Sequence, residues 1–165
     1  MRQNPSFALS GVDEIRRILD LNPWMTLVSH PESGPVASHY AVILDDRRDD
    51  LTLVGHMGRP DDLLHDLGNR ELLIIAQGPH GYISPQWYDD APAVPTWNYV
   101  SVHLSGVPEI LSEEENLAVL EKLTHRFEAG LPSPREMWSP PNDDAFVRRL
   151  ARGTVGFRLT PTTVV

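Results

Sequence analysis

Seven histidines are spread along the chain, and an imidazole can act as an acid or a base near neutral pH. Four of them could supply such groups: His39, His56, His80 and His103. The first three are the catalytic candidates. His80 is held between a proline and a glycine in a constrained setting, although a structural role is the alternative. The other three, His30, His65 and His125, are interpreted as surface residues.

The stretch Gly55-His56-Met57-Gly58-Arg59 ends a predicted strand and precedes a helix that begins near Pro60. Helix N-termini attract anions through their unpaired N–H groups and the helix dipole. An arginine guanidinium can hold a phosphate with two hydrogen bonds. The pattern therefore indicates a phosphate site. The alternative is an exposed arginine at a strand end, paired with Asp61 or Asp62.

Aromatic residues gather in the stretches 77–88 and 94–99, among prolines and glycines. Trp87, Tyr88, Trp97 and Tyr99 could form one wall of a site for a flat conjugated ligand. A rigid hairpin that covers the core would explain the same pattern, so both interpretations stay open.

Several other chemistries have no motif in this sequence. The chain holds no cysteine, no H-E-x-x-H pattern, no G-x-G-x-x-G or Walker loop and no G-x-S-x-G turn. We therefore predict no metal site and no nucleotide site of those two types. The net charge of −9, from 14 basic and 23 acidic side chains, opposes binding to nucleic-acid backbones.

The length of 165 residues predicts a single domain over residues 1–165 with a real core. No apolar run reaches the roughly 18 residues that a membrane span requires. The first residues do not resemble a signal peptide. We therefore expect a cytoplasmic protein without a membrane partner.

Hydrophobic alternation predicts strands over residues 24–29, 36–44, 51–57, 72–77, 82–84, 97–107 and 154–160. Four helices are predicted: one opened by Ser10 and Asp13, one from Pro60 to Gly68, one from Ser112 to Gly130 and one over 143–152. In the second helix, Leu63, Leu64 and Leu67 are expected to be buried. In the third, Glu115 completes a capping box with Ser112, and the buried face is lined by Leu117, Leu120, Leu123 and Phe127. Many strands joined by short links predict a mainly β fold, an antiparallel barrel with flanking helices.

Two blocks of the sequence match a known family. Gly78-Pro79-His80-Gly81-Tyr82-Ile83-Ser84-Pro85 and Val94-Pro95-Thr96-Trp97-Asn98-Tyr99 resemble the PaiB-like FMN-binding proteins, usually described as negative transcriptional regulators. The Gly55 to Arg59 stretch and Val155-Gly156-Phe157 match as well, so the resemblance covers nearly the whole chain. The family is part of the flavin split-barrel group that includes pyridoxamine-phosphate oxidases. The resemblance implies an antiparallel split β-barrel that forms a homodimer, with two FMN sites at the subunit interface.

The resemblance also implies which residues hold FMN. Ser38, His39, Tyr40 and Ala41 run alongside the flavin, His56, Met57, Gly58 and Arg59 meet the ribityl phosphate, and Trp97, Asn98 and Tyr99 lie near the interface. The chain departs from the family at Pro60-Asp61-Asp62, where the family usually reads A-N-P. Asp61 thus places a negative charge where the phosphate is expected. Residues 160–165 stand where the family tends to have a polar K-L-S-Q-N segment.

We therefore predict an FMN-binding protein in which the cofactor carries a redox step on a small-molecule substrate. The alternatives are a transcriptional regulator of the PaiB type and a flavin-free enzyme that re-uses the interface cleft.

The best basic cluster is Arg148, Arg149, Arg152 and Arg158, which we expect to pair with acids or with a dimer partner. We therefore do not expect specific DNA binding. Apolar strands such as 72–76 would leave exposed surface on a monomer, which also favours a homodimer.

Overall fold

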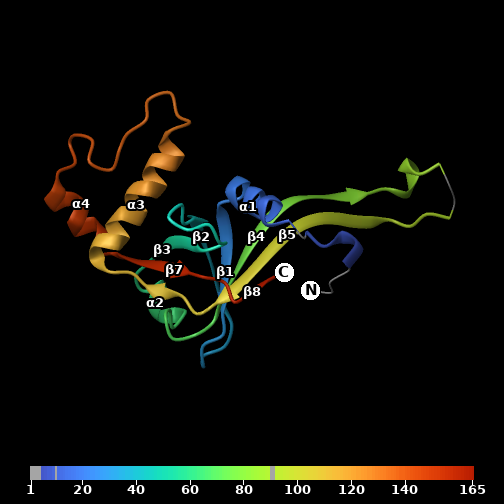
Figure 1. Ribbon diagram of the computed structural model, residues 1–165, viewed down its shortest axis with the longest axis horizontal. Coiled ribbons are helices and arrows are strands. Elements are labelled where there is room, and N and C mark those ends of the chain that lie inside the picture. The colour runs from blue at the N-terminus through green and yellow to red at the C-terminus, as the bar shows by residue number, and fades with distance from the viewer. Residues whose placement is uncertain (1–4, 10, 90–91) are drawn as a thin grey trace.

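The computed structural model describes residues 5–9, 11–89 and 92–165. Eight antiparallel strands form one sheet in the order β6-β7-β3-β2-β1-β4-β5-β8. The sheet curls around its core as a half-barrel, with helices at its flanks (Figure 1). The predicted fold class, a mainly antiparallel split barrel, is confirmed.

The strands are β1 (Trp24–Ser29), β2 (Val36–Leu44), β3 (Leu53–Gly58), β4 (Leu72–Ile83), β5 (Thr96–Gly106), β6 (Glu109–Ile110), β7 (Thr154–Leu159) and β8 (Thr163–Val164). The helices are α1 (Val12–Leu21), α2 (Asp61–Leu64), α3 (Glu113–Glu128) and α4 (Asp144–Ala151), with single 3-10 turns η1 (Pro5–Phe7) and η2 (Pro85–Trp87). The predicted bounds of β1 and β2 are confirmed, and the two-residue strands β6 and β8 were not predicted. None of the helices in the described ranges is long and apolar enough to cross a membrane.

The curled sheet is buried on both faces where helices cover it. Val42 belongs to the main core inside the barrel, together with Leu19 of α1. Its neighbour Ile43 points to the opposite face and packs with Val119 and Leu123 of α3. Successive strand residues therefore serve two hydrophobic layers, which explains why β2 ends in an unbroken apolar run.

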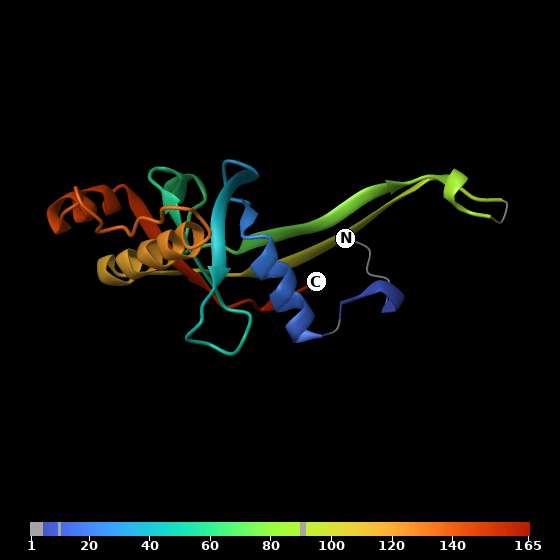
Figure 2. The same ribbon diagram turned by 90° about the horizontal axis from the view of Figure 1, so that it is seen from above.

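The β4–β5 hairpin projects from the barrel as a long arm (Figures 1 and 2). β1 pairs only with residues 72–75 of β4, and β8 pairs only with residues 104–105 of β5. The outer parts of the two strands, residues 77–83 and 96–101, therefore form a ribbon of two strands. We predicted separate strands at 72–77 and 82–84, which is wrong. The break expected at Gly78-Pro79 is a register shift between Gln77 and His80, because a bulge tolerates glycine and proline inside a strand.

The segment after Pro60 also differs from the prediction. Only Asp61–Leu64 is helical, and Leu63 and Leu64 are 75% and 54% exposed instead of buried. His65, predicted to lie at the surface, is 1% exposed. The short helix turns its leucines outward, whereas Asp62 and the C-cap residue His65 are buried.

The predicted cap of α3 is confirmed, whereas α1 begins without the predicted capping box. Ser112 and Glu115 form the predicted capping box of α3. Ser10 lies outside the described residues, and Gly11 occupies the N-cap position of α1 without a side-chain bond. Phe127, predicted to line α3, is 45% exposed.

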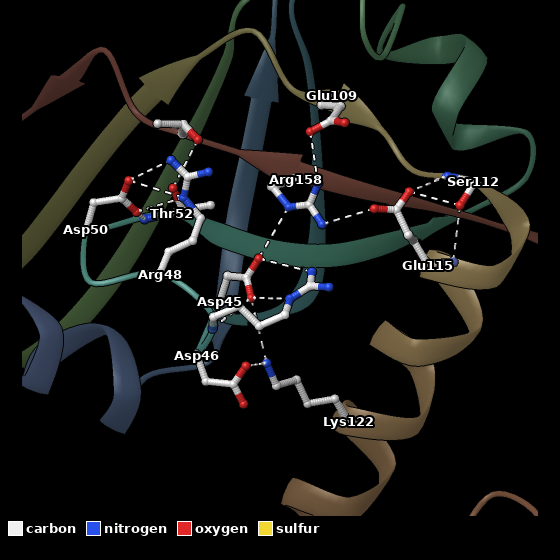
Figure 3. A network of polar contacts seen from close by, with 12 residues as sticks. Asp45, Asp46, Arg48, Asp50, Thr52, Glu109, Ser112, Glu115, Lys122 and Arg158 are labelled. Atoms are coloured by element: carbon white, nitrogen blue, oxygen red, sulfur yellow. Dashed lines mark hydrogen bonds and ion pairs between the residues drawn. The ribbon is translucent and has the colours of Figure 1, made fainter.

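An ionic network ties the β2–β3 turn to β7 and α3 (Figure 3). Asp45, 1% exposed, accepts hydrogen bonds from the side chains of Arg47 and Arg158. Arg158 also donates to Glu109 and Glu115. The charged turn between β2 and β3 thus holds one buried carboxylate that fastens the hairpin to the rest of the sheet.

Candidate functional site

A polar cluster lies where β1, β2, β3 and α2 meet. The carboxylate of Asp61 accepts one hydrogen bond from the Ser38 hydroxyl, at 3.1 Å, and one from the Tyr40 hydroxyl, at 2.8 Å. Both bonds end on the same oxygen, Oδ2. The Tyr40 oxygen in turn accepts the backbone N–H of Gly58. Ser38, Tyr40 and Gly58, which the resemblance assigned to the flavin site, are therefore brought together around Asp61.

His65 extends this cluster into the core. Its Nδ1 is 2.8 Å from Ser29 Oγ, and its Nε2 is 3.1 Å from Ser38 Oγ. The hydrogen of Ser38 is given to Asp61, so Nε2 must carry a proton and donate to Ser38. Nδ1 then accepts from Ser29. Burial lowers the pKa of His65, against a smaller opposite effect of Asp61, so the neutral ring fits this pattern.

The predicted phosphate contact, Arg59, is already paired. Its guanidinium donates to Asp62 Oδ2 at 2.9 Å, and its side chain is 54% exposed. The backbone N–H of Arg59 donates to the carbonyl of Gly153. The alternative interpretation, an exposed arginine paired with the acid that follows, describes this geometry.

His56 is the most enclosed of the catalytic candidates. Its ring lies edge-on to Tyr40 at 6.2 Å between centroids. Burial lowers the pKa of His56, which favours the neutral imidazole at pH 7. Its Nδ1 is buried without a hydrogen-bond partner among the described residues, and the same is true of Oδ1 of Asp62. Such unpaired buried atoms are rare, and they mark places where a ligand or water can bind.

The other predicted residues of β2 and β3 have different settings. His39 is exposed and stacks on Trp24 at 6.5 Å, and Trp24 is itself 66% exposed. The side chain of Met57 lies in the core, fully buried, so only its backbone can meet a ligand. Ala41 approaches Gly55 so closely that a Cβ there would lie 3.2 Å from its carbonyl oxygen, which explains the glycine.

Trp97, Asn98 and Tyr99 lie on the arm, away from the polar cluster of their own chain (Figure 1). Tyr82 is the register partner of Trp97, and His80 is the partner of Tyr99. The rings of His80 and Tyr82 lie 5.9 Å and 6.3 Å from the Trp97 ring. One face of the arm therefore presents these aromatic rings, and all three side chains are exposed.

Two hollows in the described surface lie away from the residues that the resemblance assigned to FMN. One, of about 660 Å³, is lined by residues that include Ser29, His30 and Arg70. The second, of about 550 Å³, lies beside the ionic network and includes Asp45 and Lys122. Neither is lined by a residue that the resemblance assigned to FMN.

Sequence reasoning missed His65 and Ser29. Their bond joins residues 36 positions apart, and no local pattern connects them. A weak signal existed, because Ser29 and Ser38 interrupt apolar strands, and Ser29 is 3% exposed. A serine in a buried strand position usually has a polar partner.

The model of the family described as "Putative FMN-binding domain" matches residues 1–163 of this chain. The chain belongs to this FMN-binding domain family. The resemblance inferred from the motifs is thereby confirmed. The chain is also similar to the protease synthase and sporulation protein PAI 2 of Bacillus subtilis, with 28% identity over 93% of this chain and 73% of that protein.

Solved structures share the fold. The flavocytochrome Anf3 from Azotobacter vinelandii has a TM-score of 0.73 and 16% identity, over 99% of this chain and 70% of that one. The FAD and heme binding protein from Mycobacterium smegmatis has a TM-score of 0.67 and 18% identity, over 94% and 70%. The family match supports a flavin as the cofactor, and the structural likeness supports the fold.

Proposed function

We propose that this member of the FMN-binding domain family is a flavoprotein that acts as an oxidoreductase on a small molecule. The family match over nearly the whole chain is the observation that carries the proposal. The two structural neighbours, a flavocytochrome and an FAD and heme binding protein, are flavin proteins, which supports the same cofactor class. When bound, a flavin supplies the transfer of electrons or hydride.

The described residues fit one part of FMN and not the other. The aromatic face of the arm, with Trp97 and Tyr82, is a flat surface suited to a conjugated ring. The cluster around Asp61 does not fit a phosphate, because its one guanidinium is paired with Asp62 and its hydroxyls point at a carboxylate. His39, His56 and His80 stay predictions for acid–base roles. A neutral His56 would accept a proton in such a role, because burial lowers its pKa.

We infer that a second copy of the chain completes the site. The arm is a two-stranded ribbon with exposed aromatic rings, and such ribbons have little stability in water unless something covers them. A homodimer would bring the arm of one copy to the polar cluster of the other, which the single chain keeps apart.

Sedimentation velocity tests the dimer. Trp97→Ser should shift the protein toward monomer without unfolding the barrel, since Trp97 is 55% exposed. Phe127→Ser, on α3 at the opposite end of the molecule, serves as the control (Figure 1). A wild-type protein that sediments as a monomer at micromolar concentration would refute the shared site.

The visible absorption spectrum of the purified protein, before and after flavin is added, tests the cofactor. We expect the bands of bound flavin, with quenched fluorescence on titration with FMN or riboflavin. A colourless protein that binds neither flavin would refute the proposal and leave the flavin-free enzyme as the better reading.

The structure offers little for a direct regulator. Two of the four arginines in the basic cluster are bound by acids: Arg158 by three carboxylates and Arg148 by Asp144 and Glu114. Neutralised arginines contribute little to phosphate contacts on DNA. We therefore propose that this protein does not bind DNA specifically by itself.

A further inference from the structure

We infer that Asp61 makes the proposed flavin site select an uncharged polyol end, so that the protein prefers riboflavin to FMN. This inference rests on the proposed function and on the family resemblance, which implies that the ribityl phosphate end of a flavin meets His56 to Arg59, next to Asp61. It concerns the chemical class of the ligand that this end of the site accepts.

The hydroxyl donors of the cluster are already used. Ser38 and Tyr40 each have one hydroxyl hydrogen, and both point at Oδ2 of Asp61. The Ser38 oxygen accepts from His65, and the Tyr40 oxygen accepts from Gly58. Burial and the bond to Asp61 raise the pKa of Tyr40, so it keeps its proton. A phosphate needs several donors at once, and here a carboxylate occupies that position.

The charges of the cluster also oppose a phosphate. Asp61 and Asp62 carry two negative charges against the single positive charge of Arg59, which is bound to Asp62 at 2.9 Å. A flavin phosphate adds about 1.5 to 2 further negative charges at neutral pH. Like charges at such short range repel strongly in a partly buried site.

Acceptors are what the cluster has left. Oδ1 of Asp61 receives no hydrogen bond from the residues that the structure describes, whereas Oδ2 receives two. Oδ1 of Asp62 is buried and has no hydrogen-bond partner among the residues that the structure describes, and Asp62 as a whole is only 8% exposed. Free acceptors in a polar site favour a ligand that brings O–H donors, such as the hydroxyls of a ribityl chain.

Fluorescence titration of the full-length protein with riboflavin and with FMN tests this selection. Wild type should bind riboflavin about tenfold more tightly than FMN or better. Asp61→Asn keeps an oxygen for Ser38 and Tyr40 but removes the charge and adds a donor. It should shift the affinity ratio toward FMN by about tenfold or more. Asp46→Asn changes the net charge equally at a side chain that is 70% exposed, and it should leave the ratio unchanged.

A second measurement needs no variant. Added salt should strengthen FMN binding to wild type by screening the repulsion, and should leave riboflavin binding nearly unchanged. If wild type prefers FMN, or if the ratio is the same in Asp61→Asn, the selection by Asp61 is wrong while the flavin proposal stands. If neither flavin binds to wild type, the proposed function and this inference both fail.

Discussion

Replacing Asp45 by asparagine probes the ionic network that fastens the β2–β3 hairpin (Figure 3). Asparagine has nearly the same shape, so the substitution removes charge and leaves packing intact. Burial alone would raise the pKa of Asp45. Hydrogen bonds from Arg47 and Arg158 outweigh that effect and lower the pKa from 3.8 to about 2.

The lowered pKa sets the expected size of the effect. At about 1.4 kcal/mol per pKa unit, the difference between 3.8 and about 2 is worth about 2 kcal/mol of stability at neutral pH. A carboxylate with a lowered folded-state pKa stabilises the protein above its unfolded pKa. That stabilisation is lost as the pH falls from about 4 toward 2. For a chain of this length, the loss corresponds to a melting temperature lower by roughly 4 to 8 °C.

Urea unfolding of wild type and Asp45→Asn at pH 7 and at pH 3 measures this contribution. We expect the free energy of unfolding of wild type to exceed that of Asp45→Asn by about 2 kcal/mol at pH 7, and this difference to narrow at pH 3. Asp46→Asn is the matched control. The Asp46 carboxylate neighbours Asp45 in the chain but is 70% exposed, so it should contribute less than about 1 kcal/mol to stability. If the two variants lose equal stability at pH 7, or if the gap stays constant with pH, the network does not act as argued.

Two further predictions concern the core beneath the site. Burial lowers the pKa of His65 from 6.5, so the unfolded chain takes up a proton that the folded protein refuses, and stability should fall as the pH drops below about 6.5. His65→Gln should make that fall between pH 7 and pH 5 shallower in urea unfolding, and an equally steep fall would contradict the buried neutral ring. Gly156→Ala should lower the free energy of unfolding by about 1 to 3 kcal/mol, because a Cβ there would lie 2.8 Å from Asn116 Oδ1 and 3.0 Å from its Cα. Gly81→Ala, with open space around it, is the control for thermal unfolding, and equal losses in the two variants would refute this reading.

Much of the fold follows from local patterns. The bounds of β1 and β2 follow from alternation and apolar runs, and the start of α3 follows from its capping box, because each signal lies within a few residues. The motifs around His80 and Trp97 identified the family, which supplied the barrel topology. Topology itself depends on contacts between distant strands, and local patterns alone only favoured some antiparallel barrel.

The candidate site was predicted in part. The sequence pointed to Ser38, Tyr40 and Gly58 through the resemblance. It also showed that Asp61 places a negative charge where the family resemblance puts the phosphate. It could not show that both hydroxyls donate to Asp61, or that Arg59 is held by Asp62. The two bonds to Asp61 depend on side-chain geometry between β2 and α2, 21 to 23 residues apart. The Arg59–Asp62 pair is local, and the sequence offered it as an alternative without deciding between the two interpretations.

The sequence by itself determined the family, the strand-rich composition of the barrel and the acidic departure at Asp61. Only the tertiary structure decided which side chains are buried and what they bind. His65 is buried because Ser29 of β1 and Ser38 of β2 satisfy both of its ring nitrogens. Leu63 and Leu64 are exposed because the polar side of their short helix is the one that finds partners. Burial is a property of the surroundings, and the surroundings of these residues come from parts of the chain that are far away in sequence.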